Sequence, residues 1–114
     1  MSFDRLPAHL EVAGILRRAE ASGGFGTVLR KGDPDRGSIL LFISRRGTHL
    51  VCLERMTSLS GGYDWQASGP PESASSADIA DFLAKRARFD DDFWAVELDI
   101  ADAERFIAET TSAG

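Results

Sequence analysis

Cysteine is almost absent from this sequence of 114 residues, with Cys52 as the single example. One cysteine cannot form an internal disulfide, whereas secreted domains of this size often depend on several. No apolar run approaches the roughly 18 residues that suggest a membrane span. The only apolar stretch near the N-terminus, from Leu10 to Leu16, is followed by two arginines, which inverts the order found in a signal peptide. We therefore expect a cytoplasmic protein that does not bind a membrane.

Groups that bind metals or act as nucleophiles are equally scarce. His9 and His49 are the only histidines, and neither has a partner at the spacing of a zinc site. The three aspartates from Asp90 to Asp92 lack the pattern of a calcium loop, so we interpret them as a solvated connection. Cys52 lies in an apolar segment, where burial raises a thiol pKa, the opposite of what a nucleophile needs. The sequence predicts no metal, no cofactor and no catalytic residue.

The composition is that of an ordinary globular protein, with 43% apolar and 27% charged residues. At this length we expect a single domain spanning residues 1–114, with an ordered core from about 8 to 109. The net charge of −5 is unevenly placed, because residues 1–57 hold nine Arg and Lys against six Asp and Glu, and residues 58–114 hold four against twelve. A basic half and an acidic half can pair within one fold or guide a protein partner.

The first half of the chain predicts a helix followed by strands. Apolar residues at helical spacing indicate an amphipathic helix from His9 to Ser22, and Gly23-Gly24 suits its C-terminal end. The strands that we expect next are 25–30, 38–44 and 49–55. Turn-forming residues at 32–37 favour a hairpin between the first two strands, and the apolar second strand should lie centrally in the sheet.

The second half predicts one more strand, a helix, a last strand and a short helix. Ser75 and Asp78 have the spacing of a helix N-terminal cap. The remaining strands are expected at 63–67 and 93–99, with a closing helix at 102–109 and a looser stretch at 56–62. The order α-β-β-β-β-α-β-α indicates an α+β fold with about five strands in a mainly antiparallel, mixed sheet, two longer helices and a short C-terminal helix.

Three segments together resemble a known family. The first is Ile15 to Glu20. The second is Leu29 to Asp33 followed by Gly37 to Leu40, and the third is Arg88 to Asp90 followed by Phe93 to Glu97. Their order and spacing are similar to the domain-of-unknown-function family numbered fourteen ninety-one, short proteins of alphaproteobacteria, from about Leu10 to Asp99. The resemblance implies a bacterial, intracellular, stand-alone domain, and it brings no activity, cofactor or catalytic residue with it.

The strongest functional candidates are aromatic and basic. Tyr63 and Trp65 share one face of a strand, Arg45 and Arg46 sit at a hairpin tip, and Arg30-Lys31 ends a neighbouring strand. We interpret Tyr63 and Trp65 as anchors for a homodimer or another protein partner, with Arg45 and Arg46 as a polar rim. The sequence thus favours a small non-catalytic binding or protein-interaction module.

Two alternatives remain open from the residues alone. A small enzyme would need distant polar groups, such as Arg17, Asp33, Tyr63 and Glu97, to meet in one pocket. A nucleic-acid-binding sheet would need the cations on one face, and a sequence pI of about 4.9 argues against it.

Overall fold

The computed structural model describes residues 6–57 and 62–112, which form three helices and one five-stranded sheet. In chain order the elements are α1 (Ala8–Ala21), β1 (Phe25–Arg30), β2 (Ile39–Arg45), β3 (Thr48–Thr57), β4 (Tyr63–Ser68), α2 (Ser76–Ala87), β5 (Trp94–Asp99) and α3 (Ala103–Ser112). This order confirms the predicted α+β fold. The predicted loose stretch at 56–62 lies partly outside the described residues, and its first two residues belong to β3.

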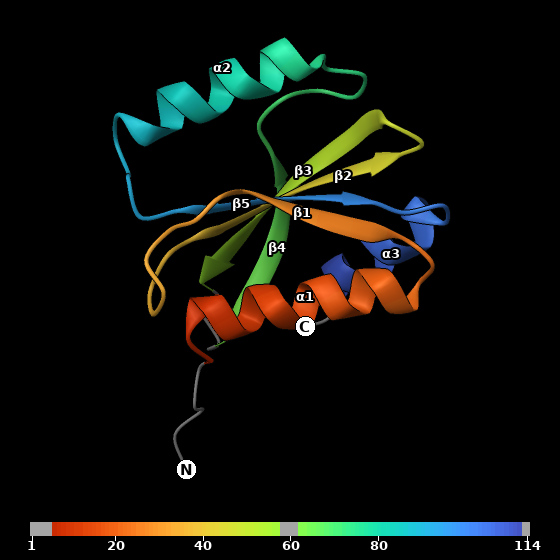
Figure 1. Ribbon diagram of the computed structural model, residues 1–114, viewed down its shortest axis with the longest axis horizontal. Helices are drawn as coiled ribbons and strands as arrows, with labels where there is room; N and C mark the ends of the chain where they lie inside the picture. Colours follow the sequence, from red (N-terminus) through yellow and green to blue (C-terminus); the bar gives the residue numbers. More distant parts are fainter. Residues whose placement is uncertain (1–5, 58–61, 113–114) are drawn as a thin grey trace.

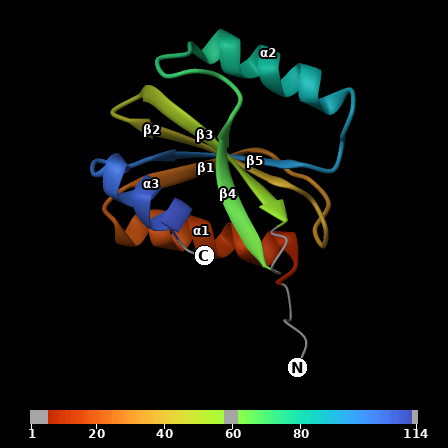
Figure 2. The same cartoon turned by 180° about the vertical axis from the view of Figure 1, so that it is seen from behind.

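The sheet has the strand order β1-β5-β2-β3-β4, with β2 in the centre as predicted. Its only parallel pair in the described chain is β2 with β5, and the other neighbours are antiparallel. One face is covered by α2, and the other by α1 and α3 (Figure 1). The opposite view brings the β4 edge to the front, so β1 and β4 are the two edges of the sheet (Figure 2).

The predicted hairpin between β1 and β2 is wrong, because β5 lies between them. The turn-forming segment crosses over the start of β5 instead of joining neighbouring strands. It is held there by the amide of Asp33, which donates to the carbonyl of Asp92 at 2.8 Å. Gly37 allows the close approach, since a Cβ there would lie 2.2 Å from the same carbonyl oxygen. Local turn chemistry could not reveal a strand inserted from more than fifty residues away.

Two apolar clusters hold the layers together. The larger joins α1 and α3 to one sheet face, and the smaller joins α2 to the other through Leu40, Phe42, Cys52, Phe93 and Ala95. Trp94 is buried in the larger cluster with Val96 and Leu98, which confirms the face predicted from their alternation. Strands β2 and β5 therefore contribute side chains to the core on both faces of the sheet.

Capping fixes where α2 begins. The Ser75 hydroxyl accepts from the amide of Asp78 at 3.1 Å, and the Asp78 carboxylate accepts from the amide of Ser75 at 3.0 Å. This reciprocal capping box is the one that the sequence predicts. No helix in the described residues is both long and apolar enough to cross a bilayer.

Candidate functional site

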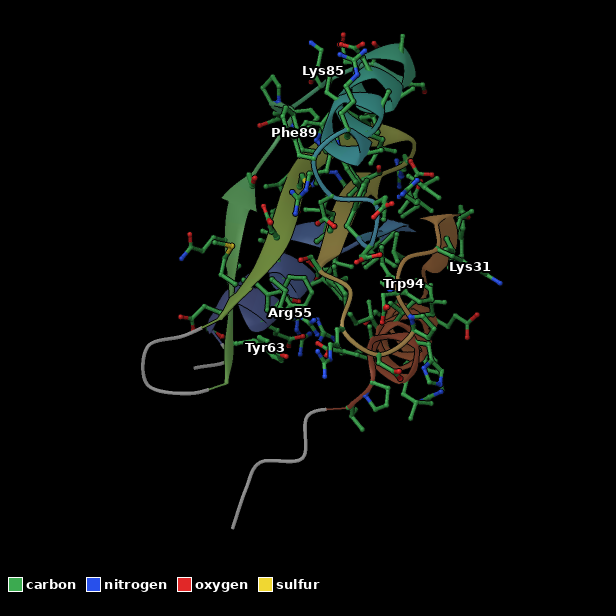
Figure 3. All side chains as sticks on the ribbon, turned by 90° about the vertical axis from the view of Figure 1, so that its left-hand side faces the viewer. Lys31, Arg55, Tyr63, Lys85, Phe89 and Trp94 are labelled. Carbon is green, nitrogen blue, oxygen red and sulfur yellow. The ribbon has the colours of Figure 1, made fainter. Side chains whose placement is uncertain are left out.

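The two predicted aromatic anchors lie together at one end of the β4 edge. Tyr63 and Trp65 are both half-buried on the sheet face that carries α1, and Trp65 packs against the larger apolar cluster. The Arg55 guanidinium lies 4.1 Å from the centre of the Tyr63 ring, and the two side chains are neighbours in Figure 3. The predicted shared face of Tyr63 and Trp65 is therefore present.

Arg55 ties this corner of the sheet to α1. Its side chain is only 7% exposed and forms an ion pair with Glu11, a residue of α1. The same guanidinium donates to the carbonyl of Gly37 at 3.1 Å. Because a buried guanidinium is costly without such partners, Arg55, Glu11 and Tyr63 form one interdependent cluster.

Two cavities flank this cluster, and Leu6 lines both of them. The first has a volume of about 270 Å³ between α1, α3 and the sheet, and Trp65 is among its lining residues. The second, of about 540 Å³, is bordered by Arg55 and Tyr63. Leu6 and Leu10 remain 58% and 47% exposed at their rims. We call the pair the α1 cavities.

The α1 cavities carry positive charge in an acidic chain. Their lining includes four arginines, Arg17, Arg18, Arg36 and Arg55, against two carboxylates, Glu11 and Asp35. The lining thus has a formal charge of +2, whereas the whole chain has −5. Arg17 and Arg36 are exposed, and Arg18 lies 4.2 Å from the centre of the Phe106 ring. Exposed cations beside exposed apolar side chains favour a ligand that is both acidic and apolar.

The structure does not bring Arg45 and Arg46 to this site. They lie at the β2–β3 turn, where Arg45 is opposite Thr48. Arg55 is seven residues further along β3 than Thr48, which is about 23 Å at the rise of a strand. Arg45 pairs with Glu104 of α3, and this hydrogen bond lowers the pKa of Glu104. The amides of Arg46 and Gly47 each donate to the Asp99 carboxylate at 2.9 Å. These contacts stabilise the turn.

Arg30 and Lys31 lie across the sheet from Tyr63, since β1 and β4 are opposite edges. Arg30 donates to the carbonyl of Asp91 at 2.8 Å, and its guanidinium lies 4.7 Å from the centre of the Phe93 ring. Figure 3 places Lys31 on the far side of the sheet from Arg55 and Tyr63. The cations needed for a nucleic-acid surface are therefore divided between separate corners of the sheet.

The residues considered for an enzyme pocket are also separated. Arg17, Tyr63 and Glu97 line three different cavities. Asp33 lies in the crossing segment, where its carboxylate accepts from the amides of Arg36 and Asp35 at 2.9 and 2.8 Å. Those two hydrogen bonds hold the pKa of Asp33 below its usual value. Its role is to stabilise a turn.

The cavity that contains Glu97, of about 310 Å³, also borders His49 and the N-terminus of α2. His49 is buried, and its Nε2 lies 3.3 Å from the carbonyl oxygen of Pro70. Its Nδ1 is buried without a hydrogen-bond partner in the described part of the chain. His9, in the first turn of α1, likewise contacts a carbonyl, that of Pro34, at 3.0 Å.

The aspartate run differs in one detail from its interpretation as a solvated connection. Asp91 and Asp92 are exposed, and the Asp91 carboxylate raises the pKa of Asp92. Asp90 is half-buried, accepts from the amide of Asp92 at 3.0 Å and lies 3.5 Å from Arg86. Within residues 6–57 and 62–112, no three His, Cys, Asp or Glu side chains are placed to hold a metal ion.

Comparison with known proteins assigns this arrangement to a family. Residues 6–108 match the family described as "Protein of unknown function (DUF1491)". The chain belongs to the DUF1491 family. A crystal structure of a DUF1491 protein from Caulobacter crescentus CB15 shares 35% identity at a TM-score of 0.73, and covers 90% of this chain and 94% of that one. An NMR structure of a DUF1491 protein from the same organism shares 33% identity at a TM-score of 0.69, over 86% and 88% of the two chains.

A third solved structure shows only a shared fold. The solution structure of an A. tumefaciens protein matches at 24% identity and a TM-score of 0.67, over 84% of this chain and 86% of that one. No functionally curated protein matches the chain. The family resemblance predicted from the three sequence segments is confirmed, and the DUF1491 description brings no activity with it.

Sequence reasoning missed most of the groups around the α1 cavities of this DUF1491 protein. Glu11 and Arg55 are 44 residues apart in the chain, and no local pattern links a helix residue to a strand residue at that separation. The sequence contains one weak indication that Leu10 is exposed. Leu10 lies outside the apolar stripe of the helix, which consists of Val12, Ile15, Leu16 and Ala19.

Cys52 provides a direct check on the α2 side of this DUF1491 fold. The side chain is buried, and burial raises the pKa of the thiol to about 12, as the sequence predicts in direction. We expect Cys52 to react with an aromatic disulfide reagent at pH 8 more than about a hundredfold slower in the native protein than in urea, because almost no thiolate is present. Absorbance of the released thiol measures both rates, and equal rates would contradict the packing of α2 over β3.

Proposed function

We propose that this protein is a small, non-catalytic, cytoplasmic protein-interaction module that binds an acidic peptide segment bearing apolar side chains in the α1 cavities. The observation that carries the proposal is the lining itself: exposed Leu6 and Leu10 stand beside half-buried Trp65 in a site of charge +2. Apolar anchors supply contact area, and the arginines select acidic partners and speed their association.

The proposal keeps Tyr63 and Trp65 as anchors and replaces Arg45 and Arg46 as the polar rim. Arg17 and Arg36 take that place, because they are exposed at the cavities that these aromatics line. Arg46 is exposed at the β2–β3 turn, and it is not among the lining residues of either cavity. It therefore serves as a matched control for the effect of charge alone.

A titration with synthetic peptides tests this function. The probe is a short peptide of alternating Glu and Leu, and the comparison is the same peptide with Lys in place of Glu. We expect the Glu peptide to shift the amide NMR signals of Leu10 and the indole signal of Trp65, and the Lys peptide to bind at least about tenfold more weakly.

Two charge reversals and one apolar change sharpen the result. Arg17→Glu and Leu10→Asp should each weaken binding of the Glu peptide roughly tenfold, while Arg46→Glu should change it less than about twofold. Leu10 and Arg17 are both exposed, so their variants should stay folded. Equal binding of both peptides, or equal loss in the Arg46 variant, would contradict a specific acidic site at α1.

A further inference from the structure

Strand β1 is an edge strand whose protection against pairing is limited to a bulge near its C-terminal end. The sheet ends at β1, and the exposed side chains along it are Phe25, Thr27 and Leu29, none of them charged. Phe25 and Leu29 are 63% and 40% exposed. Natural edge strands commonly carry charged side chains or proline, which prevent a second strand from adding to the sheet.

The single cation of β1, Arg30, is not placed to repel a second strand at this edge. Arg30 is half-buried, and it donates to the carbonyl of Asp91 while its guanidinium lies against the Phe93 ring. The bulge between Val28 and Arg30 is confined to the end of the strand, so Phe25 to Val28 keep a regular register with β5. The other edge, β4, differs because it exposes the charged Asp64.

We propose that a second copy of this chain pairs with β1 through the same strand, antiparallel, about a two-fold axis at Thr27. A two-fold interface brings the same patch of both subunits together, so the strand must complement itself. In this register Thr27 faces the partner's Thr27, and Phe25 comes near the partner's Leu29, which lies at the bulge. Both contacts join uncharged side chains, which stabilises cross-strand pairing and buries no unpaired charge.

Charge complementarity supports this register. Because the two strands are antiparallel, the exposed Lys31 that follows β1 comes near the turn at Gly23 of the partner subunit, directly after the C-terminal end of its α1. That end of a helix carries partial negative charge, and Glu20, one turn earlier, is exposed. Lys31 is therefore attracted both to the helix end and to Glu20, and the symmetry of the dimer repeats this attraction. It opposes the repulsion between two chains that each have a net charge of −5.

This dimer is independent of peptide binding in the α1 cavities. The apolar anchors of the peptide site, Leu6, Leu10 and Trp65, lie just before α1, in its first turn and on the β4 edge. The dimer uses the β1 edge and the C-terminal end of α1. The outcome of one experiment therefore does not decide the other. A dimer with no peptide binding, or binding by a monomer, separates the two proposals.

Sedimentation equilibrium over a concentration series tests the proposal. We expect the native protein to form dimers, and Thr27→Lys to raise the dissociation constant roughly tenfold or more, because two ammonium groups then face each other at the axis. Gln66→Lys places the same charge on an exposed position of β4 and should leave the dimer unchanged. A native protein that stays monomeric at all concentrations, or equal weakening by both variants, overturns the proposal.

A charge swap tests the register separately. Lys31→Glu should weaken the dimer, more at low salt than at high salt, and adding Glu20→Lys in the same chain should restore it. Lys85→Glu is the control, since Lys85 is exposed on α2, away from β1. Circular dichroism confirms that each variant is folded. If the double variant fails to recover the dimer, pairing at this register is overturned.

Discussion

Replacement of Trp94 by alanine is expected to lower the free energy of unfolding by about 3–5 kcal/mol. Trp94 is buried in the cluster between β5 and α1, and its indole Nε1 donates to the carbonyl of Asp33 at 2.7 Å. The alanine variant thus leaves a cavity and removes one of the hydrogen bonds that fix the β1–β2 crossing segment beside β5. Urea denaturation followed by far-ultraviolet circular dichroism measures the loss.

Two controls separate these contributions. Trp94→Phe keeps most of the packing and removes only the indole donor, so it should cost clearly less than Trp94→Ala, with about 1–2 kcal/mol from the unpaired Asp33 carbonyl. Asp91→Ala should cost under about 0.5 kcal/mol, because its side chain is exposed and Arg30 contacts its backbone carbonyl. Similar losses for Asp91→Ala and Trp94→Ala would contradict the assignment of Trp94 to the core.

Local signals in the sequence predicted the elements of this fold well. The strand Phe25–Arg30 was predicted with its observed limits, because β-branched and aromatic residues follow a Gly-Gly stop. The start of α2 followed from Ser75 and Asp78, since a capping box depends on residues three positions apart. The run Ile39 to Ile43 indicated a strand covered on both faces, and β2 is the central strand with all five side chains buried.

Relations between distant segments could not be predicted in the same way. The parallel register of β2 with β5, such as Leu41 opposite Val96, depends on which strand fills the gap beside β1. Either partner of β1 would bury apolar residues, so the hydrophobic pattern did not exclude the hairpin. Only the contacts of the crossing segment with Asp92 and Trp94 decide it.

The candidate site shows the same division. Alternation placed Tyr63 and Trp65 on one face, as observed, because strand side chains have a period of two. We grouped Arg45 and Arg46 with Tyr63 and Trp65 because the strands that carry them follow one another closely in the sequence. This grouping ignored the length of β3, which has ten residues and separates the turn from the aromatic pair. The cation that Tyr63 does contact is Arg55, which lies on β3 at the end away from that turn.

The pairing of Glu11 with Arg55 is the contact that fixes α1 against the sheet beside the α1 cavities, and removal of either partner should be strongly destabilising. Arg55 is 7% exposed, so Glu11→Ala leaves a buried guanidinium without its carboxylate, at a cost of about 2–3 kcal/mol. Arg55→Ala also removes the hydrogen bond to Gly37 and the contact with Tyr63. We expect a comparable or larger loss from that variant.

A double-mutant cycle isolates the interaction itself. The variant with both replacements should lose about 1–3 kcal/mol less than the sum of the single losses, because the second replacement no longer strands a charge. The matched control is the pair of Asp81 and Lys85 on α2, whose side chains are both 67% exposed and should show a coupling below about 0.5 kcal/mol. Urea denaturation of the seven proteins, the native protein and three variants for each pair, gives both couplings. A Glu11–Arg55 coupling no larger than that of Asp81 and Lys85 would mean that burial of Arg55, and not its ion pair, holds α1 in place.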